Sequence, residues 1–171
     1  MRNEKLIRIN DEIALMAVCG NRLIDIGLNA SNSVIVTVSS DYSSCLGMWL
    51  RHFLSKDGEI CEGISIEVPY PDERWEGLYN IALERVFRYN IQLNDLYEKT
   101  LVLVEAGVIK GGTYYHITKY IRDNFPKTKI VTVAMFENKH SKFKSDIVAK
   151  YYDNDVEDLT FWWEEENKHW N

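Results

Sequence analysis

The stretch Leu101-Val102-Leu103-Val104-Glu105-Ala106-Gly107-Val108-Ile109-Lys110-Gly111-Gly112-Thr113 decides the fold that the sequence predicts. Its first four residues are all apolar, as in a strand that is buried on both faces of a sheet. A loop with three glycines follows, and a helix is predicted from about Thr113 to Asn124. The stretch therefore predicts a buried strand, a glycine-containing loop and a helix in direct succession.

Other strands and helices alternate on both sides of this stretch. Strands are predicted at Val34–Val38, Ile64–Val68, Leu101–Val104 and Ile130–Met135. Helices are predicted over residues 10–21, 45–54, 72–87 and 113–124. Such alternation predicts a single α/β domain, with a mainly parallel sheet flanked by helices.

Ligands of parallel sheets bind beyond the carboxyl ends of the strands. Two predicted loops lie there, at Ser39–Ser44 and Glu105–Thr113. In the second loop, glycines let backbone N–H groups approach a ligand, and the start of the following helix adds partial positive charge. Lys110 supplies a full charge and Thr113 a hydroxyl group. These features favour an anion site suited to a phosphate monoester.

The loop matches neither common phosphate-binding motif of this kind. A Walker A loop needs Lys directly before Ser or Thr, whereas Gly112 precedes Thr113 here, and the spacing of a GxGxxG motif is absent. On loop chemistry alone, a plain turn between strand and helix, whose glycines serve packing, stays an equal alternative.

The stretch resembles the phosphoribosyl-pyrophosphate (PRPP) motif of type I phosphoribosyltransferases. Four apolar residues precede Glu105, which matches the first acid of the motif, and Gly111 and Thr113 match the end of its loop. The C-terminal residues 144–148 and 161–164 resemble the hood of the hypoxanthine-guanine and xanthine-guanine branch. The resemblance covers roughly residues 30–170, with a core at about 30–135 and a hood or C-terminal segment at 136–171.

The resemblance implies a role for each part of the site. Glu105 would act at the ribose or at a magnesium-bound water, and Mg²⁺ is expected only with a phosphorylated ligand. The remaining implied residues are the 5′-phosphate loop Gly107, Lys110, Gly111, Gly112 and Thr113, the pyrophosphate loop Ser39, Ser40 and Asp41, and the base-binding residues Lys139, Trp162 and Trp163. Core or interface packing stays open for the two tryptophans, and a surface loop for Lys139.

The stretch departs from the motif at three positions, and three hypotheses for the function stay open. Ala106 stands where the family has a second acid, Ile109 where purine enzymes have a proton-accepting aspartate, and Lys110 where a small hydroxyl residue is usual. One hypothesis is an enzyme of purine salvage that transfers phosphoribose to or from a purine base. The alternative is a catalytically inactive, phosphoribosyltransferase-like module that binds a nucleotide for regulation. A third hypothesis is a scaffold whose acidic surface and Trp-rich tail meet another protein.

Composition sets the remaining expectations. The 171 residues carry a formal net charge of −6, which argues against a protein devoted to the nucleic-acid backbone. No apolar run approaches the roughly 20 residues that cross a bilayer, and residues 1–6 lack the apolar region of a signal peptide. Three cysteines without CxxC spacing predict reduced, mostly buried thiols. We expect a cytoplasmic homo-oligomer that binds a nucleotide or PRPP.

Overall fold

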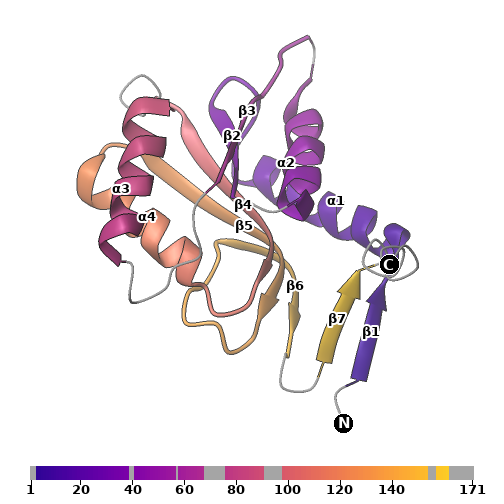
Figure 1. Ribbon diagram of the computed structural model, residues 1–171. Helices are drawn as coiled ribbons and strands as arrows, with labels where there is room; N and C mark the ends of the chain where they lie inside the picture. Colours follow the sequence, from indigo (N-terminus) through magenta and orange to yellow (C-terminus); the bar gives the residue numbers. More distant parts are fainter. Residues whose placement is uncertain are drawn as a thin grey trace.

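The computed structural model describes residues 3–38, 41–56, 58–67, 76–90, 98–153 and 157–161, and strands and helices alternate along them. The elements, shown in Figure 1, are β1 (Asn3–Ile7), α1 (Ile9–Asp25), β2 (Ser33–Val38), α2 (Asp41–Leu54), β3 (Glu62–Ile66), α3 (Glu76–Glu84), the π-helical segment η2 (Arg85–Asn90), β4 (Thr100–Val108), α4 (Gly112–Asn124), β5 (Lys129–Asn138), β6 (Ile147–Tyr152) and β7 (Glu157–Phe161).

Five strands form one parallel sheet in the order β3-β2-β4-β5-β6. From β2 the chain first moves outward to β3, and then returns to place β4 on the other side of β2. The strand order therefore reverses between β2 and β4, and ligands of open α/β sheets bind at such a reversal. A separate two-stranded parallel sheet pairs β1 with β7.

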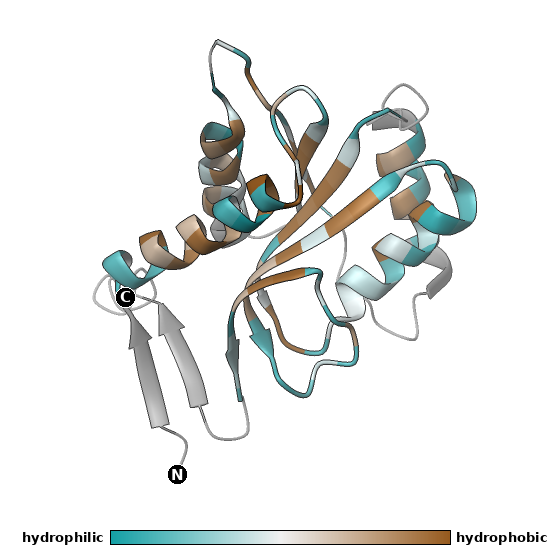
Figure 2. Ribbon diagram, turned by 180° about the vertical axis from the view of Figure 1, so that it is seen from behind, coloured by the Kyte–Doolittle hydropathy of each residue, from teal (hydrophilic) through white to brown (hydrophobic). Residues whose placement is uncertain are grey.

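Helices cover both faces of the five-stranded sheet, with α1 and α2 on one side and α3 and α4 on the other (Figure 1). The central strands are predominantly hydrophobic, as Figure 2 shows, because each of their faces is covered. All six residues of β2 are buried, and alternate side chains feed two cores. Val34, Val36 and Val38 enter the core of the α4 side, while Ile35 enters the core of the α1–α2 side.

The structure confirms the predicted fold class and lengthens several elements. β4 continues to Val108 and β5 to Asn138 because the two strands keep pairing, through Val108 and Glu137, beyond the last β2–β4 pair at Thr37 and Val104. Val68 and the predicted helix start at Asp72 lie outside the described residues. Cys19 and Cys61 are buried as expected, whereas Cys45 on α2 is exposed. Within the described ranges, none of the helices is both long and apolar enough to span a membrane.

Candidate functional site at the carboxyl end of the sheet

The loop after β4 is shorter than the sequence indicated. Gly107 and Val108 belong to the strand, so the connection to α4 consists of Ile109, Lys110 and Gly111. Their placement corrects the predicted loop of Gly107–Thr113 at its amino-terminal end. At its other end the helix begins at Gly112, one residue before the predicted Thr113.

Gly111 precedes α4 in a conformation that only glycine adopts readily. Its φ of 78° lies in the left-handed region. A side chain there would also collide with its surroundings, because an added Cβ would lie 2.4 Å from Phe143 Cβ and 2.8 Å from Ser141 Oγ. The chain therefore turns into α4 while pressed against the segment that follows β5.

The first turn of α4 offers free backbone donors. Helix geometry leaves its first N–H groups without intrahelical partners, so Gly112 and Thr113 present amides at this end. The first turn contains no acidic residue that would oppose an anion, and the exposed Lys110 precedes it. Donors, the helix dipole and a lysine thus coincide at one helix start.

A cavity of about 370 Å³ opens directly at this loop. Its volume falls within the usual range for a small-molecule site. The described residues that line it are Glu105, Gly107, Val108, Ile109, Lys110, Gly111, Gly112 and Thr113. The whole glycine-containing stretch of the sequence therefore surrounds one hollow at the carboxyl end of β4.

Glu105 is the acidic residue of this lining. Removal from water raises the pKa of its carboxyl group to about 8, because burial disfavours the charged form. Tyr114 lies nearby on α4, fully buried, with its hydroxyl donating to the Val133 carbonyl at 2.6 Å. Burial first, and the Glu105 charge second, hold the pKa of Tyr114 well above its usual value. At neutral pH the cavity therefore presents a largely protonated Glu105.

Ala106 is held by a contact with the opposite side of the strand reversal. Its backbone N–H donates to Ser43 Oγ at 3.1 Å, and both residues are buried. Because β2 has ended before this point, the hydroxyl of α2 takes the place of a strand partner. The start of α2 is thereby tied to β4 one residue after Glu105.

The structure brings together part of the predicted site. Glu105 and the five predicted phosphate-loop residues all line the cavity. Asp41 begins α2, while its side chain, Ser39, Ser40, Trp162 and Trp163 lie outside the described residues. Lys139 follows β5 directly, is exposed, and is not part of the cavity lining.

Sequence reasoning missed the side chains that support the loop. Ser43 falls within the predicted loop Ser39–Ser44 without a role of its own, and neither Phe143 nor Glu137 is among the predicted site residues. Phe143 packs against Tyr114, with ring centroids 5.5 Å apart, and Glu137 is fully buried. A signal was present only for Phe143, an aromatic residue within a run of polar and charged ones.

Solved structures match this chain over nearly its whole length. A xanthine-guanine-hypoxanthine phosphoribosyltransferase from Helicobacter pylori gives a TM-score of 0.63 at 15% identity, with 98% of each chain covered. A purine phosphoribosyltransferase from Pyrococcus horikoshii gives 0.65 at 13% identity, with 94% of each chain covered. A protein from Neisseria gonorrhoeae with bound ppGpp gives 0.67 at 15% identity, covering 99% of this chain and 96% of that one.

The likeness rests on structure, since no protein-family model and no curated protein sequence matches the chain. Two of these neighbours are purine phosphoribosyltransferases, the group that the Glu105–Thr113 stretch resembles. The structural match covers almost the whole chain and therefore includes the five-stranded parallel sheet. The protein therefore has the fold of the type I phosphoribosyltransferases.

Proposed function

We propose that the protein binds a purine nucleotide or PRPP, with the 5′-phosphate seated against the amides of Lys110–Thr113. The observation that carries this proposal is the cavity, whose lining combines a glycine-containing loop, the first backbone N–H groups of α4 and Lys110. Hydrogen bonds to a charged group of this kind contribute about 1.5–3 kcal/mol each. A phosphate monoester supplies enough acceptor oxygens to engage several of these donors together.

Transfer of phosphoribose between pyrophosphate and a purine base is the first candidate activity. The structural neighbours from Helicobacter pylori and Pyrococcus horikoshii are named for this class of reaction, and they support the candidate by analogy. In this chain Glu105 would contact the ribose, and Ser39, Ser40 and Asp41 would contact the pyrophosphate. Lys139, Trp162 and Trp163 would contact the base.

A binding module without catalysis is the second candidate, and Ile109 favours it. This residue lines the cavity, and its side chain is 52% exposed where purine enzymes would carry a proton acceptor. An isoleucine cannot accept a proton from the base, and Ala106 offers no second carboxylate. The ppGpp bound to the Neisseria gonorrhoeae protein supports nucleotide sensing as the alternative.

Magnesium fits this site only as a companion of the ligand. Among the described residues, no group of three or more His, Cys, Asp or Glu side chains could hold a metal ion. Glu105 could contribute one oxygen, directly or through water, once it has lost its proton. Because Mg²⁺ keeps several waters and binds phosphate oxygens readily, we expect its affinity for the ligand-free protein to be low. Bound Mg²⁺ would supply charge stabilisation for a pyrophosphate group.

Two assays on the full chain test the proposal and separate its candidates. Calorimetry with guanosine and inosine 5′-monophosphate, ppGpp and PRPP should show saturable binding of at least one ligand. Release of pyrophosphate from PRPP with each purine base, in the presence of Mg²⁺, would identify an enzyme. Binding without turnover would identify the regulatory module. Absence of binding to every ligand would overturn the proposed function.

A further inference from the structure

The connection between β5 and β6 lacks a helix. Parallel neighbours usually need a crossover of a dozen or more residues, whereas residues 139–146 make this one with eight. Because Ile147 pairs with Val133, the connection returns along half of β5 before β6 begins. A crossover this short depends on side chains to fix its path.

Asp146 and Glu137 fix the returning end of the crossover. Asp146 Oδ2 accepts hydrogen bonds from the backbone N–H and the hydroxyl of Thr132, both at 2.8 Å. Glu137 Oε2 accepts from the Ser145 N–H at 2.8 Å, although its side chain is fully buried. The second oxygen of Glu137 makes no hydrogen bond with the described residues, so its charge needs another source of compensation.

Lys144 supplies that compensation. Its Nζ lies 3.5 Å from Glu137 Oε1 and donates to the Lys139 carbonyl at 3.0 Å. The N–H of Lys139 donates in turn to the Tyr152 carbonyl at 2.8 Å. The backbone of Lys139 is therefore held on both sides, while its side chain stays exposed.

The same crossover touches the candidate phosphate site. Phe143 meets Gly111 at the turn into α4 and packs against the ring of Tyr114. The Ser141 hydroxyl, which also lies against Gly111, donates to the Phe143 carbonyl at 2.8 Å. Lys139 and the phosphate loop are thereby linked through one packed segment.

We propose that Lys144 and Glu137 are positioning residues for recognition of the purine base. Resting on the proposed function, this inference assigns them the task of holding Lys139 at a set separation from the Lys110–Thr113 amides. The fixed separation should raise the affinity for a ligand that contains both a base and a phosphate, whereas the affinity for a ligand without a base should not depend on it.

The test compares two lysines of the same crossover. Lys144→Met removes the hydrogen bond and the ion pair of Nζ, together with its cation–π contact with the Tyr151 ring at 5.9 Å. Lys142→Met is the matched control, because Lys142 makes no hydrogen bond or ion pair among the described residues. Affinities for guanosine or inosine 5′-monophosphate and for ribose 5-phosphate are measured by calorimetry. Lys144→Met should weaken binding of the nucleotide by about tenfold or more and binding of ribose 5-phosphate by less than about twofold. Lys142→Met should change neither.

Two further variants separate positioning from folding. Lys144→Arg should restore nucleotide affinity. Glu137→Gln keeps an acceptor for Ser145 but removes the charge, and it should lower the affinity for the nucleotide relative to that for ribose 5-phosphate, as Lys144→Met does. Equal affinities of Lys144→Met and Lys142→Met for the nucleotide, or equal losses for both ligands, would overturn the inference while the proposed function stands. If the parent protein binds neither ligand, the inference fails, and the proposed function is then decided by the separate assays with ppGpp and PRPP.

Discussion

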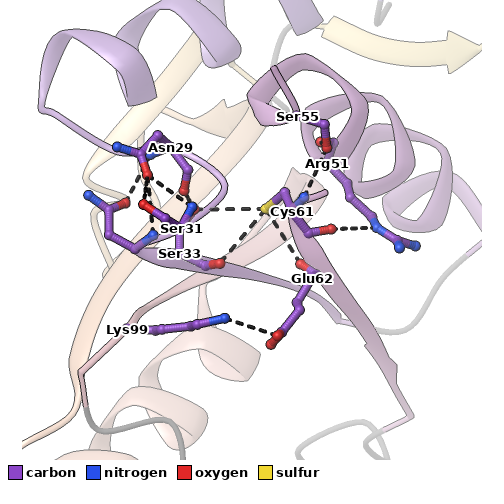
Figure 3. Close-up of polar contacts among 9 residues, drawn as sticks. Asn29, Ser31, Ser33, Arg51, Ser55, Cys61, Glu62 and Lys99 are labelled. Atoms are coloured by element: carbon purple, nitrogen blue, oxygen red, sulfur yellow. Dashed lines mark hydrogen bonds and ion pairs between the residues drawn. The ribbon is translucent and has the colours of Figure 1, made fainter. Parts of the chain in front are cut away.

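The two ends of the five-stranded sheet differ in how their polar groups are satisfied. At the amino end, shown in Figure 3, polar groups of neighbouring segments bind one another through hydrogen bonds and an ion pair. Ser55 Oγ accepts from the Cys61 N–H at 2.9 Å, and Arg51 Nε donates to the Cys61 carbonyl at 2.6 Å. Lys99, just before β4, pairs with Glu62 of β3 at 3.0 Å. Partners for these groups are built into the chain.

The carboxyl end leaves several polar groups without partners in the described chain. Glu105 is partly buried beside a cavity, and the amides that open α4 lack helical acceptors. Asn138 Nδ2, at the end of β5, is buried and makes no hydrogen bond with the described residues. Gly111 adds a turn with positive φ. The polar groups of the amino end are thus paired within the chain, while the carboxyl end has unpaired donors of the kind that the proposed phosphate site requires.

The largest expected effect is that of Gly111→Ala. The left-handed conformation and the contact with Phe143 should together lower the free energy of unfolding by about 2–4 kcal/mol. Phosphate-ligand affinity should fall by about tenfold or more, since the loop must move. Denaturant unfolding and calorimetry measure the two effects.

Gly27→Ala is the matched control. Gly27 has a φ of 85°, but an added Cβ meets nothing within 4 Å. This variant should lose only about 1 kcal/mol of stability and keep its ligand affinity. If both variants bound nucleotide as well as the parent, the loop would be a simple turn.

The second effect concerns pH and Glu105. With its pKa raised from 4.5 to about 8, the folded protein retains a proton here that the unfolded chain releases. The stability contribution of this group therefore falls as pH rises from about 4.5 to 8, by at most about 1.4 kcal/mol per unit, and is constant above that range. Glu105→Gln should gain stability relative to the parent over the same interval. Parallel stability–pH curves of the two proteins would contradict the raised pKa.

At the amino end, Ser55→Ala should lower stability by a smaller amount and leave ligand binding nearly unchanged. It removes the acceptor of the Cys61 N–H and the donor to the Arg51 carbonyl, and we expect a loss of about 1–2 kcal/mol in the free energy of unfolding. Nucleotide affinity should change by less than about twofold, because the residue is remote from the cavity. Equal damage to binding and stability would remove the distinction between the two ends.

Lys110→Ala should give the smallest change. An exposed lysine adds charge to the phosphate site, but the backbone donors remain when it is removed. Binding of a 5′-nucleotide should weaken by a few-fold, with a salt dependence lower than that of the parent, and the unfolding midpoint should stay unchanged. Calorimetry at two ionic strengths measures the change. A loss as large as that of Gly111→Ala would assign the site to the side chain rather than to the amides.

Much of the fold could be predicted from the sequence because hydrophobic patterns reveal buried strands. Val34–Val38 and Leu101–Val104 are apolar or β-branched throughout and form central strands. The ends of β4 and β5 could not be predicted, because pairing between Val108 and Glu137 overrides the weak strand preference of glycine and glutamate.

The candidate site was predictable where the chain is continuous and hidden where distant segments meet. Gly107–Thr113 lie within seven residues and line one cavity. The contact of Phe143 with Gly111 and the bond between Ser43 and Ala106 join segments far apart in sequence, so no local pattern encodes them. The homo-oligomeric state stays a prediction.

Chemical shifts of backbone amides during titration test the difference between the two ends most directly. Guanosine 5′-monophosphate is added to the ¹⁵N-labelled full chain, and the amides of Lys110–Thr113 are followed beside those of Ser33, Ser55 and Cys61. The expected result is a set of saturable shifts at Lys110–Thr113, with the amino-end amides unmoved. Saturation at the amino end alone, or no saturable shift at Lys110–Thr113 with this nucleotide, ppGpp or PRPP, would contradict it.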